Sequence, residues 1–189
     1  MDKIELLSPA GDFNSFKAAI EAGADAVYFG LNQFNARKRA TNINLKELEY
    51  LTNLAKSYNV KSYLTLNVLI KDKEFPQILE LSKNAILSGI DAIIVQDIGL
   101  VSILQKFFPD LEIHASTQMT SHNISQCEFL KSFKNIKQIN LSRELSLEEL
   151  KPICKFLENN NIVSEVFVHG AYCISYSGQC YFSNDLYGE

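Results

Sequence analysis

Short apolar runs rich in β-branched residues alternate with longer amphipathic runs along the chain, with a repeat of roughly 25–30 residues. The runs that predict strands cover residues 4–7, 26–29, 60–66, 92–95, 111–113, 136–141 and 162–168. Apolar residues at helical spacing predict intervening helices over residues 13–20, 45–55, 75–86, 100–107, 124–133 and 147–157. Alternation of this kind is typical of a parallel sheet covered by helices.

An internal echo supports a barrel. The sequence Gly-Ala-Asp-Ala-Val-Tyr-Phe-Gly at residues 23–30 is matched by Gly-Ile-Asp-Ala-Ile-Ile-Val at residues 89–95, with Gly at a helix end and Asp at a strand start. A doubly wound sheet, the alternative, often carries a Gly-rich phosphate fingerprint after its first strand, and residues 8–12 contain neither that fingerprint nor a P-loop. The predicted fold class is therefore α/β, a parallel (β/α) TIM-like barrel.

The strand count predicts an incomplete barrel. A closed barrel needs eight strands and typically about 250 residues, whereas the 189-residue chain supplies about seven strands and six helices. We expect residues 1–189 to form a single N-terminal barrel domain that is truncated before the eighth strand. We also expect this chain alone to be marginally stable and inactive, and to need the C-terminal part of the same protein or a partner subunit.

Composition narrows the setting of the protein. No apolar run approaches the roughly 20 residues that span a bilayer, and the N-terminus lacks an apolar signal core, so no membrane role is expected. The net charge of −4 gives no global nucleic-acid footprint, so an RNA partner would meet a local basic patch. Four cysteines without a secretory signal predict reduced thiols and a cytoplasmic location.

Polar residues follow the predicted strands at the end where barrel enzymes carry their chemistry. The candidates for a ligand-binding mouth are Ser8, Arg37, Asn67, Gln96, Asp97, His114, Gln118, Arg143 and His169. The two arginines suit an anionic ligand, because a guanidinium binds carboxylate or phosphate in a bidentate way. The alternatives are that Asp97 caps the next helix and that Arg143 pairs with Glu144 or Glu148. No catalytic residue can be named, because neither a Ser/His/Asp triad nor an HExxH motif is evident.

The four cysteines fall into two classes. Cys127 and Cys154 lie in the apolar stripes of two predicted helices and are interpreted as core residues. Cys173 and Cys180 lie in a loop rich in Ser, Gly and Tyr. A disulfide between them is the alternative to zinc or iron–sulfur ligation. Two thiolates are half of a site that usually takes about four protein ligands.

The run Glu-Val-Phe-Val-His-Gly-Ala-Tyr-Cys-Ile-Ser-Tyr-Ser-Gly-Gln-Cys at residues 165–180 resembles the signature of peptidase family U-32, the collagenase-like peptidases. Further blocks similar to this family lie at residues 5–11, 23–28, 34–37, 95–97, 114–119 and 141–149. The blocks resemble most the large-subunit branch of the family, which includes the ribosomal-RNA hydroxylation protein.

This resemblance implies a barrel-like N-terminal domain and either of two activities. One is an iron–sulfur enzyme that hydroxylates a base of ribosomal or transfer RNA, without oxygen or with prephenate; the other is a collagenase-like peptidase acting on a protein substrate. The family implies a four-iron four-sulfur cluster on four cysteines, of which Cys173 and Cys180 match the first two. Hydroxylation is favoured over proteolysis. A protease needs an activated nucleophile or a metal-bound water, and neither can be named in this sequence. A non-catalytic RNA-binding fragment is a third alternative.

Overall fold

The computed structural model describes residues 4–36, 43–170 and 174–179. The chain divides into two compact units, residues 1–112 (unit 1) and residues 113–189 (unit 2), which are described in turn.

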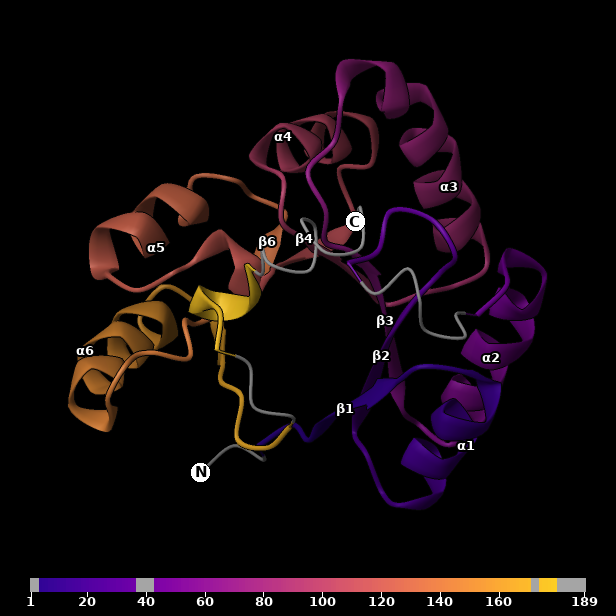
Figure 1. Cartoon of the computed structure of the whole chain (residues 1–189), viewed down its shortest axis with the longest axis horizontal. Coiled ribbons are helices and arrows are strands. Elements are labelled where there is room, and N and C mark those ends of the chain that lie inside the picture. Colours follow the sequence, from indigo (N-terminus) through magenta and orange to yellow (C-terminus); the bar gives the residue numbers. More distant parts are fainter. Residues whose placement is uncertain (1–3, 37–42, 171–173, 180–189) are drawn as a thin grey trace. The chain divides into compact units, whose positions relative to one another are not determined.

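Unit 1 alternates strands and helices. Its strands are β1 (Leu7–Ala10), β2 (Ala26–Gly30), β3 (Lys61–Leu66) and β4 (Ala92–Val95), and its helices are α1 (Phe13–Glu21), α2 (Leu45–Ser57), α3 (Phe75–Leu87) and α4 (Ile98–Phe107), with a 3-10 turn η1 (Asp72–Glu74). The strands pair in sequence order and are all parallel. Helices α1, α2 and α3 lie on one side of β1, β2 and β3 (Figure 1), as in a barrel and unlike a doubly wound sheet.

Both faces of the unit 1 sheet are buried, which explains its nearly continuous apolar strands. On the helical side, Phe16 of α1 packs edge-to-face on Phe29 of β2, with ring centroids 5.4 Å apart, and both rings are fully buried. On the other side, alternate strand residues form a second cluster, made of Leu7, Ala26, Tyr28, Tyr63, Ala92 and Ile94.

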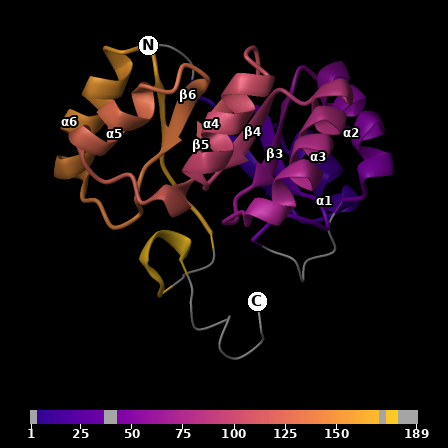
Figure 2. The ribbon, with the colours of Figure 1, turned by 90° about the horizontal axis from the view of Figure 1, so that it is seen from above.

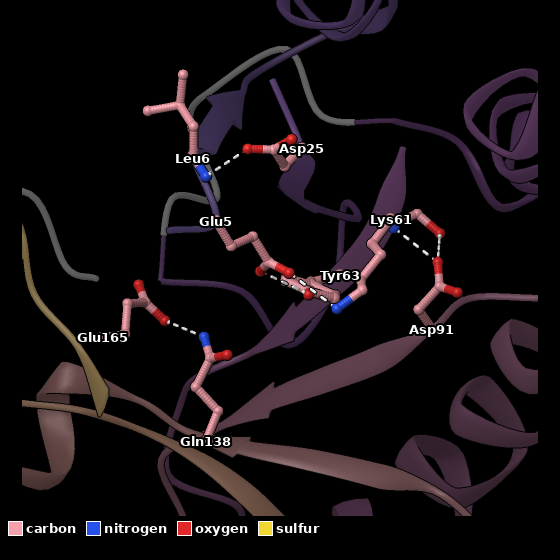
Figure 3. Close-up of polar contacts among 9 residues, drawn as sticks. Glu5, Leu6, Asp25, Lys61, Tyr63, Asp91, Gln138 and Glu165 are labelled. Atoms are coloured by element: carbon pink, nitrogen blue, oxygen red, sulfur yellow. Dashed lines mark hydrogen bonds and ion pairs between the residues drawn. The ribbon is translucent and has the colours of Figure 1, made fainter. Parts of the chain in front are cut away.

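The internal echo has a structural cause. Gly23 and Gly89 follow α1 and α3 with φ of 89° and 86°, a left-handed conformation that glycine adopts without steric cost. Two residues later, the carboxylate of Asp25 accepts the backbone N–H of Leu6 at 2.9 Å. The carboxylate of Asp91 likewise accepts the N–H of Ser62 at 2.7 Å (Figure 3). Each aspartate therefore ties its own strand to the start of the preceding strand segment.

Unit 2 continues the same alternation. Its strands are β5 (Glu112–Ala115, whose first residue is the last of unit 1), β6 (Ile136–Asn140) and β7 (Val163–Glu165). Its helices are α5 (Ile124–Lys131) and α6 (Leu147–Glu158), and its 3-10 turns are η2 (Thr117–Met119) and η3 (Tyr176–Gly178). The three strands are parallel, and α5 and α6 pack side by side (Figure 2). The β5–β6 register shifts between Ile113 and His114, a bulge that displaces the pairing by one residue.

Three predicted strands had a boundary that was wrong by two residues or more. β1 begins at Leu7 instead of residue 4, and includes Ser8 and Pro9; proline is accepted there because β1 pairs only with β2 within unit 1. β5 extends to Ala115, so His114 lies inside the strand. β7 ends at Glu165 instead of residue 168, because its partner β6 ends at Asn140, with which Glu165 is in register.

Cys127 and Cys154 are free thiols on α5 and α6. Cys127 is fully buried, which confirms its predicted core role, whereas Cys154 is half-buried. Burial, and secondarily the proximity of Cys154, raises the pKa of the Cys127 thiol to about 11, so it stays protonated and unreactive at neutral pH.

Candidate functional site

In unit 1 the predicted mouth residues Asn67, Gln96 and Asp97 follow β3 and β4, but Asp97 already has partners within the fold. The expectation that Ser8 follows the first strand was wrong, because β1 spans Leu7–Ala10 and Ser8 is its second residue. The Asp97 carboxylate accepts the N–H of Leu100 at 2.8 Å, which caps α4, and the N–H of Ile70 at 3.1 Å. The capping alternative for Asp97 is therefore confirmed. Its second bond ties the loop after β3 to the start of α4.

The other unit 1 candidates that the structure describes are Asn67, Ser8 and Gln96. Asn67 follows β3 and accepts the N–H of Ala36 through its side-chain oxygen at 3.3 Å. Ser8 and Gln96 are half-buried, in β1 and directly after β4 respectively. Arg37 lies outside the described residues. The convergence of the unit 1 and unit 2 candidates on one mouth stays a prediction.

In unit 2 a carboxylate that was not among the candidates holds the segment that follows β7. Glu144, in the turn after β6, accepts the N–H of Ser177 at 2.6 Å through Oε1. It accepts the Ser177 hydroxyl at 2.6 Å through Oε2. Ser177 is fully buried, so both of its donors are removed from water and satisfied by one side chain. The sequence analysis considered Glu144 only as an ion-pair partner of Arg143, so its contact with Ser177 was missed.

Two predicted mouth residues, Arg143 and Gln118, contact the same segment. Arg143 donates from Nη2 to the backbone oxygen of Ser175 at 3.0 Å. The side-chain amide of Gln179 donates to the backbone oxygen of Gln118 at 2.7 Å, and η2 packs beside η3. Gln118 and Arg143, which follow neighbouring strands, therefore both contact residues 174–179.

The same end of unit 2 has hydrogen-bonding capacity that the described residues leave unused. Buried polar atoms without a partner among them are Gln118 Oε1, Ser121 Oγ, Asn140 Oδ1, Ser142 Oγ and Arg143 Nε. Gln118 and Ser121 follow β5, whereas Asn140 ends β6 and Ser142 and Arg143 follow it. Since buried polar groups are almost always paired, this set of donors and acceptors suits a small polar or anionic ligand.

The two histidine candidates differ in exposure. His114 is fully buried within β5, in register with Gln138 of β6. His169 is exposed beyond the end of β7. Their predicted ligand-contact roles stay predictions.

A second carboxylate that sequence reasoning missed lies on β7. Glu165 accepts the side-chain amide of Gln138 at 2.6 Å (Figure 3). It also accepts the side-chain amide of Asn140 at 2.7 Å. Gln138 and Asn140 alternate along β6 and therefore share one face of the strand. Two amides at alternate positions of a buried strand were the available sequence signal.

A polar cluster at the opposite, amino-terminal end of the unit 1 strands is structural. Glu5 binds the Lys61 ammonium at 2.8 Å and accepts the Tyr63 hydroxyl at 2.8 Å (Figure 3). The bond to Glu5 raises the pKa of Lys61, while burial and then the bond to Glu5 raise the pKa of Tyr63. In barrels this end contributes stability, whereas the chemistry lies at the other end.

The charge of Glu144 makes its contact with Ser177 pH-dependent. Burial acts to raise the pKa of Glu144, but the two bonds from Ser177 and the positive charge of Arg143 outweigh it, and the net pKa is lowered. A lowered folded-state pKa means that the stabilisation is fully present above about pH 4.3, the pKa of an unperturbed glutamate, and is lost as pH falls through the folded-state value.

We expect the amide signal of Ser177, followed by NMR in protein labelled with ¹⁵N-serine, to stay constant above about pH 4.3 and to shift below it. The Glu144→Gln variant is the control, because it has no carboxylate to titrate at this position. A Ser177 titration centred above that pH in the wild type would contradict the lowered pKa.

The predicted metal ligands Cys173 and Cys180 lie outside the described residues. Within residues 4–36, 43–170 and 174–179, no group of three His, Cys, Asp or Glu side chains is arranged to hold a metal ion. The donor chemistry still fits an iron–sulfur cluster or zinc, because thiolates are the ligands that these centres prefer. None of the helices described is long and apolar enough to cross a membrane.

A family model for peptidase family U32 matches residues 11–189. The chain belongs to this family. The solved structure of the U32 peptidase Mk0906 has the same fold, with a TM-score of 0.68 at 14% identity over 87% of this chain and 67% of that chain. The U32 fold is TIM-like, so the predicted fold class is confirmed together with the family.

Curated U32 relatives carry names from both predicted activity classes. The 23S rRNA 5-hydroxycytidine C2501 synthase of Escherichia coli is 40% identical over 99% of this chain and 27% of its own length. The tRNA hydroxylation protein P of Escherichia coli is 36% identical over 97% of this chain and 40% of its length. The collagenase of Porphyromonas gingivalis is 32% identical over 97% of this chain and 45% of its length. The chain therefore spans less than half of each relative.

Proposed function

We propose that this U32 chain is the N-terminal, barrel-type part of a cytoplasmic protein that hydroxylates a base of ribosomal or transfer RNA. The observation that carries the proposal is the 40% identity to the 23S rRNA 5-hydroxycytidine synthase over 99% of the chain. The tRNA hydroxylation protein matches over nearly the same residues, so the likeness to RNA-modifying proteins extends to more than one RNA class.

In this proposal Cys173 and Cys180 supply two thiolate ligands to a four-iron four-sulfur cluster, and the remaining ligands come from outside residues 1–189. The cluster would supply redox chemistry that no protein side chain provides. The chain itself would bind an anionic group, either RNA phosphate or an organic acid such as prephenate. A buried donor supports this role for Arg143, because its guanidinium Nε has no partner among the described residues.

Proteolysis is the second candidate, favoured by the 32% identity to a collagenase. This identity is lower than the 40% identity to the 23S rRNA 5-hydroxycytidine synthase, which supports placing the peptidase second.

The test is complementation in Escherichia coli strains that lack the 23S rRNA 5-hydroxycytidine synthase or the tRNA hydroxylation protein P. The full-length protein that carries this chain is expressed in each strain, and nucleosides from rRNA and tRNA are measured by mass spectrometry. We expect the hydroxylated nucleoside to return in one strain and to be absent with Cys173→Ser. Collagen cleavage by the purified protein, with no change in either RNA, would instead establish the peptidase. RNA binding with neither activity would establish the non-catalytic alternative.

A further inference from the structure

The six residues between Cys173 and Cys180 are held at several points. Glu144 accepts two hydrogen bonds from Ser177, Arg143 donates one to the oxygen of Ser175, and the backbone of Gln118 accepts one from Gln179. We call Gln118, Arg143 and Glu144 the clasp. All three come from the segments after β5 and β6, so the clasp ties residues 174–179 to the carboxyl ends of two neighbouring strands.

We propose that the clasp is a positioning device that fixes residues 174–179 and thereby sets how Cys173 and Cys180 are presented to a metal centre. The metal-binding part of this inference rests on the proposed function, whereas the ordering of residues 174–179 does not. Glu144 is the central positioning residue of the clasp, because its carboxylate accepts both the backbone N–H and the hydroxyl of the fully buried Ser177.

The backbone of Ser177 shows what Glu144 has to hold. Its φ is 45°, in the left-handed region of the backbone that residues other than glycine rarely adopt. Such conformations persist only where surrounding contacts stabilise them, and they gather at functional sites. The two bonds of 2.6 Å to Glu144 are the contacts that stabilise this one. Gly178 follows with φ of 80°, so two successive residues adopt the left-handed conformation and reverse the chain between the cysteines.

The ordering of residues 174–179 matters because an extended segment of this length could hold the two cysteines too far apart to bind one metal centre. From Cys173 to Cys180 the chain takes seven steps, and an extended chain of that length spans about 23–25 Å. Two thiolates of one zinc ion each lie about 2.3 Å from the metal, and those of one cluster are also close neighbours. An unrestrained segment would lose conformational entropy on bringing the sulfurs together. A segment that is already ordered loses less, so binding is tighter.

The test compares Glu144→Gln with Glu148→Gln in the full-length protein, purified without oxygen. Both variants replace one exposed glutamate by its amide, but Glu148 lies in the first turn of α6 and does not belong to the clasp. Hydrogen exchange of peptides covering residues 174–179 reports the ordering directly. Iron and sulfide bound per chain, after reconstitution with limiting iron and sulfide, report the presentation of the cysteines.

With Glu144→Gln we expect exchange in this segment to accelerate by about tenfold or more, because it then opens locally. We expect cluster loading to weaken by about tenfold, the effect typical of residues that orient metal ligands. Glu148→Gln should match the wild type in both measurements. Ser177→Ala, which keeps the N–H bond and loses the hydroxyl bond, should lie between the wild type and Glu144→Gln.

Unchanged exchange in Glu144→Gln would overturn the clasp. Faster exchange with undiminished loading would overturn its role in presenting the cysteines. A wild-type protein that binds no iron would overturn the proposed function and the metal-binding role together, and the exchange result would still decide whether Glu144 orders the segment.

Discussion

Replacing Phe16 by alanine is expected to lower the free energy of unfolding by about 3–5 kcal/mol. Phe16 is fully buried between α1 and the sheet of unit 1, where its ring packs edge-to-face on Phe29. The variant loses the burial of an aromatic ring and leaves a cavity that the surrounding strands fill only in part. A loss of this size is a large share of the roughly 5–15 kcal/mol that stabilises a typical domain.

Urea denaturation of the full-length protein that carries this chain, followed by circular dichroism, measures this effect. Leu87→Ala is the matched control, because Leu87 ends α3 with 75% of its surface exposed and should change the stability by less than about 0.5 kcal/mol. If Phe16→Ala cost less than about 1 kcal/mol, the packing of α1 on β2 would not be as described.

Replacing either Cys173 or Cys180 by serine is expected to reduce the iron bound by the full-length protein by at least about tenfold. A hydroxyl is a poor ligand for iron where a thiolate is required, and the remaining cysteines cannot complete a site of about four ligands. Iron and acid-labile sulfide in protein purified without oxygen, together with its visible absorbance, measure the loss.

Cys154→Ser is the control for this experiment, since Cys154 is a half-buried free thiol on α6, far along the chain from the cysteine loop. It should keep the iron content of the wild type. Full iron content in both Cys173→Ser and Cys180→Ser would show that these cysteines are not ligands, and a disulfide or a purely structural role would then explain the loop.

Much of the fold follows from local physical chemistry. The apolar periodicity places each α-helix of the described residues to within a few residues. Gly23 and Gly89 mark the ends of α1 and α3, because their left-handed backbone suits glycine. The strand boundaries were less predictable. A strand ends where its partner ends, as at Glu165 opposite Asn140, and pairing of this kind depends on residues far apart in the chain.

For the candidate site, the sequence by itself determined which residue types follow the strands and which cysteines lie in a loop. It also determined the family, through the ordered blocks that end at Cys180. Only the tertiary structure decided what those residues do. In the structure the Asp97 carboxylate caps α4. Glu144 accepts hydrogen bonds from Ser177, 33 positions later in the chain, and Arg143 donates one to the backbone oxygen of Ser175. Local pattern predicts helices and strands because their hydrogen bonds and side-chain faces repeat along the chain. The contact between a carboxylate and a distant loop has no such period along the chain, so only the folded structure identifies the residue that it binds.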